Sequence, residues 1–374
     1  MNVLSLFDGM SCGRIALERL GIQVDNYYAS EIDKYAIQIA QKNYPNTKQI
    51  GDILDWQSWD IDWSSIDLVS GGFPCQSWSL AGKQLGDKDE RGKMFWVMLD
   101  IMKKVIENNP NAYYLMENVR MKKEFEEYIT YHTKQALPNV NKYLINSALL
   151  SAQNRVRYYW TNIPGVEQPE QRGIVLRDIL ETNTSGKYLA GENLQKNYKG
   201  GNQLNPNYKS QANTIHDVDG KSGTICAGTH GYANGYVEDF DKNLSKMTTK
   251  ENKSYALTAS YPAARPRRSK AKYEKTMVKV DDINNLPNNV DYVYDQNDKS
   301  HKPKTAGSSN MLVEDKEVYW RKLTPIECER LQTVPDDYTN HVSNTQRYKM
   351  LGNGWTVDVI AHILQNMEIN HREC

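Results

Sequence analysis

The sequence has few cysteines, no long hydrophobic run and no net charge. Its 374 residues contain five cysteines, and these form no CxxC or CxxH pair. Scattered single thiols are typical of a reducing compartment and provide no structural zinc site. No window approaches the roughly 18 apolar residues that a membrane span needs, and no basic N-terminal region precedes an apolar stretch. The sequence therefore predicts a cytoplasmic protein that is neither secreted nor inserted in a membrane.

The balance of charge excludes a strongly basic or acidic protein. Lysine plus arginine equal aspartate plus glutamate at 46 each, so net charge alone predicts no polyanionic partner. Residues 181–310, however, contain 19 basic and 14 acidic side chains, and a polyanion would be met there first. The hydrophobic content of 39% is sufficient for a large α/β domain with a smaller second domain.

Apolar runs typical of strands alternate with segments of helical spacing in the first part of the chain. We expect strands at 3–7, 26–32, 66–72 and 112–119, with helices at 14–21, 33–44 and 95–106. This alternation predicts a doubly wound, mostly parallel α/β sheet with ligands at the carboxyl ends of its strands. Helical spacing is lost from about residue 185 to about residue 322, which predicts a separate insert that is rich in strands or in loops. It returns at 324–332 and 355–367, and we expect the last helix to cover the sheet near the first strand.

Three expected strand ends carry residues suited to an adenosine-containing cofactor. The loop FDGMSCG presents backbone N–H groups, as dinucleotide sites do, although any tight strand-to-helix turn has the same pattern. Glu31 ends the second strand, where it would accept hydrogen bonds from ribose hydroxyls or simply begin a helix. Asp52 follows in GDI, where a third loop would accept a bond from an adenine amino group. Together the three favour such a cofactor.

Two further strand ends carry candidates for catalysis. Cys75 follows Pro74 at a strand exit, where a thiol is either a nucleophile or a small apolar filler. Glu117 ends the next strand after an apolar stretch that would raise its pKa and let it carry a proton. A thiolate with a proton-donating acid suits an electron-poor ring. Arg155 and Arg157 share one face of an extended segment and would stabilise a carbonyl oxygen, grip phosphate or lie on the surface.

Seven short motifs give the sequence a family resemblance. The sequence contains FDG, SEID, GFPCQS, MENV, QNRVR, RKLTPIECERLQ and LGNGW in this order, and it resembles the DNA cytosine-5 methyltransferases. The resemblance covers residues 1–165 and about 318–366. It implies an S-adenosylmethionine-dependent, Rossmann-like catalytic domain of residues 1–165 plus 319–374, with residues 166–318 as a target-recognition domain. FDGMSCG, SAQNRVRYYWTNIPG and GNGW are similar to the animal de novo enzymes and their phage relatives.

The resemblance implies a role for each matching residue. Cys75 would add to C6 of a flipped cytosine while Glu117 protonates or hydrogen-bonds N3, and Arg157 would hold O2. Arg155 would support the loop or the adjoining phosphate. The implied cofactor contacts are Phe7, Asp8, Gly9, Ser11, Glu31, Ile32, Asp52, Ile53, Pro74, Asn353 and Trp355. The implied DNA contacts are Gln76, Ser79, Lys83, Arg91, Arg265, Arg267 and Arg268.

The same resemblance sets the expected partners and leaves alternatives. A thiol mechanism needs no metal, and the expected partner of the monomeric enzyme is double-stranded DNA. A bacterial or phage-encoded, nucleoid-associated enzyme of DNA methylation or restriction-modification is the expected setting. Ser11 replaces the last glycine of the usual FxGxG, and Ala152 stands where proline is common. An RNA (tRNA) cytosine-5 methyltransferase would share these motifs, although the long insert favours DNA. A catalytically silent DNA-binding paralogue would not need Cys75, Glu117 and Arg157.

Overall fold

The structure is a computed structural model, and the chain divides into two compact units. It describes residues 1–74, 92–181, 215–227 and 321–368, together with the backbone of strands at 188–189, 235–238, 292–294, 301–303 and 319–320. Unit 1 consists of Met1–Thr182, Lys221–Ala233 and Leu323–Cys374, and unit 2 consists of Asn183–Gly220 and Asn234–Lys322. Residues 221–227 thus belong to unit 1, although they lie within the range 166–318 assigned from the sequence to target recognition.

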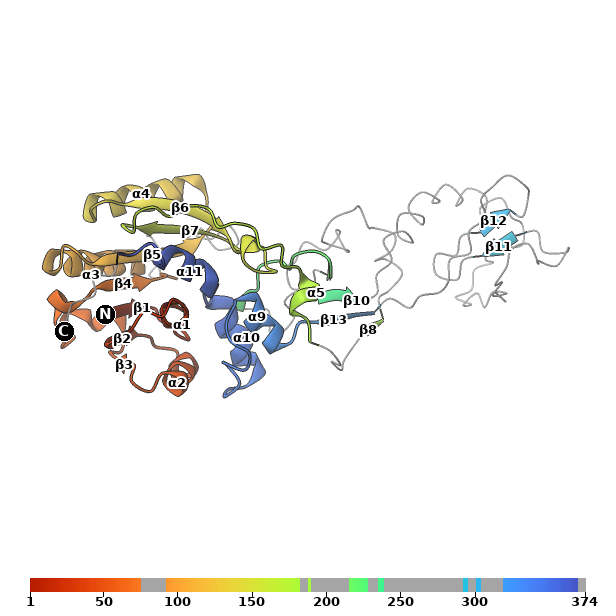
Figure 1. Cartoon of the computed structure of the whole chain (residues 1–374), viewed down its shortest axis with the longest axis horizontal. Helices are drawn as coiled ribbons and strands as arrows, with labels where there is room; N and C mark the ends of the chain where they lie inside the picture. The colour runs from red at the N-terminus through yellow and green to blue at the C-terminus, as the bar shows by residue number, and fades with distance from the viewer. Residues whose placement is uncertain are drawn as a thin grey trace, which may run out of the picture. The chain divides into compact units, whose positions relative to one another are not determined.

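The described residues of unit 1 form a seven-stranded sheet in the order β3-β2-β1-β4-β5-β7-β6 (Figure 1). Its strands are β1 (Asn2–Leu6), β2 (Asn26–Ser30), β3 (Lys48–Gln49), β4 (Leu68–Gly71), β5 (Tyr113–Val119), β6 (Asn141–Asn146) and β7 (Val156–Thr161). The pairs from β3 to β5 are parallel, whereas β7 is antiparallel to both β5 and β6. The predicted mostly parallel sheet is confirmed, and β4 is buried along its whole length, as strands covered on both faces are.

Helices connect the parallel strands, and further helices follow the last strand of this sheet in the sequence. They are α1 (Cys12–Arg19), α2 (Lys34–Asn43), α3 (Met94–Asn108) and α4 (Lys123–Ala136), followed after β7 by α5 (Leu176–Ile179), α9 (Pro325–Leu331), α10 (Asn344–Asn353) and α11 (Val357–Leu364). The right-handed crossovers from β1 to β2 and from β4 to β5 run in opposite directions, which places α1 and α3 on opposite faces. α11 packs against α1, and the backbone N–H of Glu368 donates to Tyr113 Oη at 3.0 Å. The C-terminal helix therefore returns to the sheet, as the sequence predicts.

The strand order reverses direction between β1 and β4. Doubly wound sheets bind ligands at such a switch point, in the crevice outside the carboxyl ends of the strands. Because β7 runs antiparallel to β5, its amino end lies at this same edge of the sheet. Residues after β1, β2, β4 and β5, and residues at the start of β7, are therefore brought to one rim.

The described residues of unit 2 include two small sheets. One has the order β8-β13-β10-β9 and the other pairs β11 with β12. The strands are β8 (Tyr188–Leu189), β9 (Ile215–Asp217), β10 (Gly235–Glu238), β11 (Tyr292–Tyr294), β12 (His301–Pro303) and β13 (Tyr319–Lys322). These strands fit the strand-rich alternative for the insert predicted from the loss of helical spacing. That this unit recognises the target stays a prediction.

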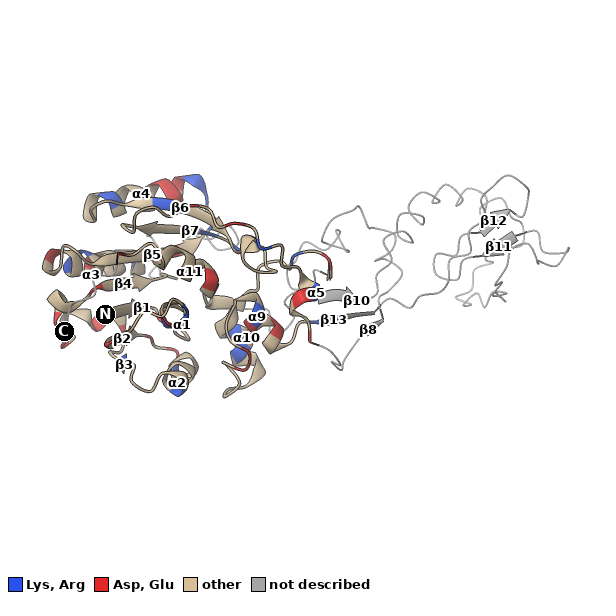
Figure 2. Ribbon diagram, viewed as in Figure 1, with Lys and Arg blue, Asp and Glu red and all other residues tan. Residues whose placement is uncertain are grey.

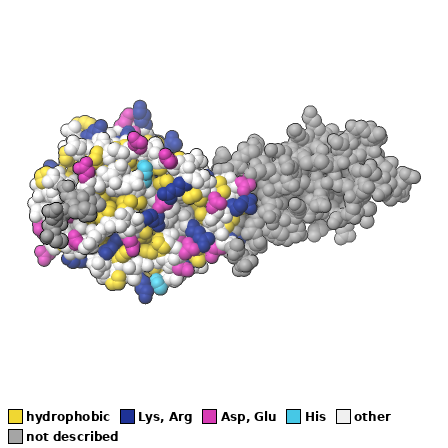
Figure 3. All heavy atoms as spheres, viewed as in Figure 1, with side chains coloured by type: hydrophobic (Ala, Val, Ile, Leu, Met, Phe, Trp, Pro, Cys, Tyr) yellow, Lys and Arg dark blue, Asp and Glu magenta, His cyan; other side chains and the backbone are white. Residues whose placement is uncertain are grey.

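Charges of both signs are interspersed on the described surface. α4 carries basic and acidic side chains together (Figure 2). The face of unit 1 in Figure 3 mixes lysine and arginine with acidic and hydrophobic side chains. A polyanion that approaches this described face therefore meets charges of both signs. In the part of the chain that the structure describes, no helix has the length and apolar character to span a bilayer.

Candidate active site

A cavity of about 350 Å³ opens at the rim where β1, β4 and β5 end. This volume lies at the lower end of the range of about 300–1,000 Å³ that is typical of ligand sites. The predicted site residues that line it are Phe7, Asp8, Gly9, Glu31, Pro74, Glu117, Arg155, Arg157, Asn353 and Trp355. Residues that lie far apart in the sequence, from position 7 to position 355, thus line one cavity.

The loop after β1 is held in a strained conformation. Phe7, Gly9 and Ser11 have φ angles of +54°, +59° and +64°. Glycine adopts this left-handed region freely, whereas another residue loses roughly 1–2 kcal/mol there. Asp8 fixes the loop, because its carboxylate accepts hydrogen bonds from Ser11 Oγ at 2.5 Å and from Tyr27 Oη at 2.7 Å. Burial raises the pKa of Asp8 despite these bonds.

Glu31 joins this loop to the start of α2. Its Oε2 accepts a hydrogen bond from the backbone N–H of Gly9 at 2.8 Å. Its Oε1 accepts from the backbone N–H groups of Ile32 at 2.7 Å and Asp33 at 2.8 Å. The carboxylate therefore has a fixed orientation beside the cavity, where the sequence predicts a contact with ribose hydroxyls.

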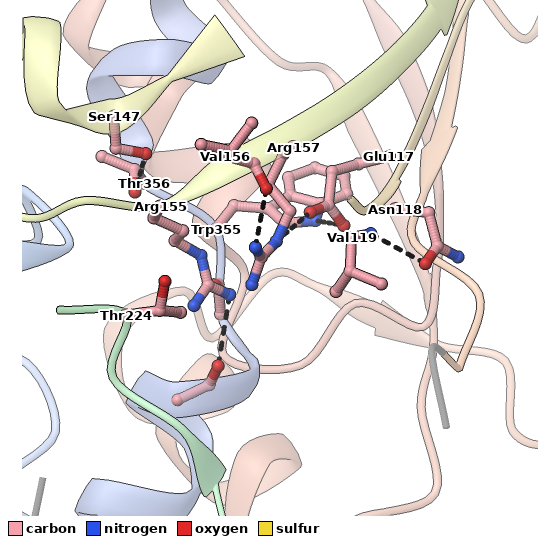
Figure 4. Close-up of polar contacts among 12 residues, drawn as sticks. Glu117, Asn118, Val119, Ser147, Arg155, Val156, Arg157, Thr224, Trp355 and Thr356 are labelled. Atoms are coloured by element: carbon pink, nitrogen blue, oxygen red, sulfur yellow. Dashed lines mark hydrogen bonds and ion pairs between the residues drawn. The ribbon is translucent and has the colours of Figure 1, made fainter. Parts of the chain in front are cut away.

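Glu117 is fixed at the other side of the cavity. In the register of β5 and β7, Glu117 faces Tyr159 and Val119 faces Arg157, so Glu117 and Arg157 are diagonal neighbours on one face. Arg157 Nε lies 3.0 Å from Glu117 Oε1 as an ion pair, and Trp355 Nε1 donates to Glu117 Oε2 at 3.1 Å (Figure 4). Each carboxylate oxygen thus has a partner, and the side chain is only 10% exposed.

Two neighbours of this acid were missed by sequence reasoning. A Cβ on Gly72 would lie 2.8 Å from Glu117 Oε2 and 3.1 Å from Trp355 Nε1, so only glycine fits there without a shift. Asn118 Nδ2 donates to the carbonyl of Phe73 at 3.0 Å and ties β5 to the segment that leads to Pro74. The double glycine in GGFPC and the asparagine of MENV were the available signals.

The guanidinium of Arg155 donates hydrogen bonds to backbone carbonyls. Its Nη1 donates to Ile225 O at 3.2 Å, and its Nη2 donates to Gly352 O at 3.2 Å and Gly354 O at 2.8 Å. Burial, reinforced by the charge of Arg157, lowers the pKa of Arg155 to about 10. These contacts favour the loop-supporting role predicted for Arg155 over a phosphate contact.

The remaining predicted residues lie outside this cavity lining or outside the described residues. Ser11 and Ile53 are buried, Ile32 is 73% exposed, and Asp52 accepts a hydrogen bond from Leu54 N at 3.0 Å. Their cofactor roles stay predictions. The residues outside the described ranges are Cys75, Gln76, Ser79, Lys83, Arg91, Arg265, Arg267 and Arg268. Within the described ranges, no group of three or more histidine, cysteine, aspartate or glutamate side chains is arranged to hold a metal.

Comparisons with known proteins agree with the fold and with the motifs. The family model for C-5 cytosine-specific DNA methylases matches residues 1–368. The type II methyltransferase M.NlaX of Neisseria lactamica is 26% identical over 98% of this chain and 96% of its own length. The orphan methyltransferase M.SPRI of Bacillus phage SPR is 25% identical over 98% of this chain and 97% of its own length.

Solved structures show the same architecture. The Entamoeba histolytica methyltransferase EhMeth has a TM-score of 0.59 at 15% identity, covering 98% of this chain and 97% of that chain. The S. pombe Dnmt2 methyltransferase has a TM-score of 0.55 at 15% identity, with the same coverage. At such low identity the likeness shows the fold alone.

Proposed function

We propose that this chain, which belongs to the C-5 cytosine-specific DNA methylase family, transfers a methyl group from S-adenosylmethionine to C5 of a flipped cytosine in duplex DNA. The supporting observation is the fixed carboxylate of Glu117, which shares a cavity with Pro74, the residue directly before Cys75. An acid beside the expected thiol is the pair that addition to a cytosine ring needs.

The cavity residues fit S-adenosylmethionine, which supplies the methyl group when bound. Glu31 offers a fixed carboxylate for ribose hydroxyls beside the strained loop at Gly9. Phe7 and Trp355 add aromatic surfaces from opposite ends of the sequence, and Asn353 adds an exposed carboxamide. Aromatic faces attract cationic groups, which suits a sulfonium.

The chemistry assigned to the chain begins with a covalent bond. The thiolate of Cys75 adds to C6, and the electron pair displaced from the ring moves toward N3 and O2. Glu117 donates a proton or a hydrogen bond to N3, and Arg157 donates to O2, so both groups stabilise the charge where it develops. C5 then carries the electron pair that takes the methyl group. The C5 proton then leaves to solvent, its electron pair reforms the C5–C6 double bond, and the C6–S bond breaks to release the thiolate.

Duplex DNA is the substrate that the observations favour. Extruding a base from a duplex costs a few kcal/mol, which contacts to the vacated strand must offset. The basic run ARPRRSKAK lies in the range expected to recognise the target, although outside the described residues. Monomeric action on DNA and residence in the cytoplasm stay predictions. Methylation of tRNA is the competing outcome.

Transfer of a tritiated methyl group tests the proposal directly. The wild type should label duplex DNA, Cys75→Ser should not, and Cys374→Ser provides the same chemical change at another cysteine and should retain labelling. A duplex with 5-fluorocytosine should trap a covalent adduct because fluorine cannot leave C5 as a proton does. Labelling of tRNA alone, or no adduct under turnover conditions, would refute the proposal. Bisulfite sequencing of host DNA would then identify the methylated motif.

The basic run has its own test. Replacing Arg267 and Arg268 together by alanine should lower the slope of log affinity against log salt by up to about two, because each phosphate contact releases about one counterion. An unchanged slope would show that neither side chain contacts phosphate.

A further inference from the structure

Gln332 is a buried polar residue that the proposed chemistry does not use. It directly follows α9 and is 0% exposed. Its Oε1 accepts from Thr356 Oγ1 at 2.8 Å and from Gln153 Nε2 at 3.3 Å. Its Nε2 donates to Leu351 O at 2.7 Å and to Gly354 O at 3.0 Å. Both donors and both acceptor positions of the carboxamide are engaged, so its orientation is determined by its neighbours.

These two carbonyls belong to the turn 351–355, which consists of the last three residues of α10 and the two residues that follow it. Arg155 donates to the same Gly354 carbonyl at 2.8 Å. The turn is therefore held between one neutral and one charged donor. Trp355 ends the turn, lines the cavity and donates its indole N–H to Glu117 (Figure 4). The orientation of Glu117 thus depends on a turn whose backbone carbonyls are hydrogen-bonded to Gln332.

The same carboxamide contacts extend to residues 221–227. Gln153, which donates to Gln332, accepts a hydrogen bond from Ile225 N at 3.0 Å. A Cβ on Gly352 would lie 2.3 Å from Ala227 N, so this segment lies directly against the turn. Ser222 pairs with the backbone beside Gln153 as well. Gln332 therefore lies where three sequence-distant segments of unit 1 meet.

We propose that Gln332 is a positioning residue for methyl transfer: its carboxamide holds the turn 351–355 so that Trp355 lines the donor pocket and fixes Glu117. The inference deepens the proposed function and rests on it. Without the carboxamide, the buried Leu351 carbonyl loses this donor, the Gly354 carbonyl keeps only Arg155, and the Thr356 hydroxyl loses its acceptor. A buried group left unsatisfied costs about 1–3 kcal/mol, which is enough to let the turn move.

The first test replaces the carboxamide and retains its volume. Gln332→Met should lower kcat/KM for S-adenosylmethionine by roughly tenfold to a hundredfold, with KM raised and kcat lowered, and leave the affinity for duplex DNA unchanged. Gln41→Met is the matched control, because Gln41 Nε2 also donates to a backbone carbonyl, that of Thr47 at 2.7 Å, outside the cavity lining. Its kcat/KM should stay within about twofold of the wild type.

The second test separates positioning from packing by pH. In Gln332→Glu a carboxylate would face Leu351 O and Gly354 O, whereas the protonated acid can donate one hydrogen bond. Burial beside two carbonyls disfavours the charged form, so a proton should restore part of the lost contact. The activity of this variant relative to the wild type should therefore rise as the pH falls from about 8 to about 6. A role in packing alone predicts parallel pH profiles.

Calorimetry with S-adenosylhomocysteine keeps this inference separate from the choice of nucleic acid. If the wild type binds this probe but does not methylate DNA, the proposed substrate is refuted. In that case the positioning role still predicts that Gln332→Met binds the probe at least about tenfold more weakly than the wild type. Equal affinity of Gln332→Met and wild type, or a Gln332→Glu pH profile parallel to the wild type, would overturn the positioning role. A loss of stability in Gln332→Met with unchanged KM and kcat per folded molecule would also overturn it.

Discussion

Gly72→Ala should disable the site while leaving the fold intact. The added methyl carbon would lie 2.8 Å from Glu117 Oε2 and 3.1 Å from Trp355 Nε1, and the first distance is too short for a real contact. The backbone of Gly72 is not in the left-handed region, so alanine causes no torsional strain there. The clash must therefore be relieved by a shift of the acid, the indole or β4.

The size of the effect follows from this geometry. Overpacking a filled site costs about 1–3 kcal/mol. The Trp355–Glu117 hydrogen bond of 3.1 Å should break before β4 moves, because β4 is hydrogen-bonded to β1 on one side and to β5 on the other. If the acid moves, the lost transition-state stabilisation of about 1.4–2.8 kcal/mol corresponds to a tenfold to hundredfold fall in kcat/KM.

Methyl transfer and urea unfolding should be measured on the same preparations. Gly13→Ala is the control for stability, because its Cβ would lie 3.5 Å from Trp355 Cζ3 and 3.6 Å from Tyr27 Oη, which are ordinary contacts. Gly13 lies in α1, where alanine favours the helix by up to about 1 kcal/mol, so this variant should be at least as stable as the wild type. A Gly72→Ala enzyme with kcat/KM within about twofold of the wild type would show that the acid tolerates displacement.

Three further predictions concern buried groups beside the cavity. Ser11→Gly and Ser11→Ala both lose the hydrogen bond to Asp8, but only glycine removes the strain of φ +64°. Urea unfolding should therefore show that Ser11→Gly is about 1 kcal/mol more stable than Ser11→Ala. Burial raises the folded pKa of Asp8 above its ordinary value of 3.8, so the folded state holds this proton more tightly. Wild-type stability should therefore rise relative to Asp8→Asn as the pH falls through the folded pKa toward 3.8, and a constant difference in unfolding free energy would contradict this. Burial also raises the pKa of Cys12 to about 12, so iodoacetamide at about pH 8 should label Cys12 only in unfolded protein, as peptide mass spectrometry would show.

The strands, most helices and the rim residues were predictable because they depend on local patterns. Apolar runs mark β1, β4 and β5, and a polar residue directly after such a run lies at the carboxyl end of the strand. Parallel strands bring those ends together, so Glu31 and Glu117 were expected on one rim and both line the cavity. The buried carboxamides were not predictable. In sequence, Gln153 and Gln332 look like surface glutamines, and only the tertiary packing shows that they contact each other.

The direction of β7 was also beyond sequence reasoning, and the active-site geometry depends on it. Spacing predicts that Arg155 and Arg157 share a face, but a strand of this composition can pair in either direction. A parallel β7 paired over the same residues would place Arg157 opposite Leu115, four residues or about 13 Å from the rim position beside Val119, at about 3.3 Å per residue. The antiparallel register sets Arg157 opposite Val119 instead, and the guanidinium reaches Glu117 at 3.0 Å. The strand direction, determined by long-range pairing, therefore makes Arg157 a partner of the acid at the rim, whereas Arg155 donates to backbone carbonyls.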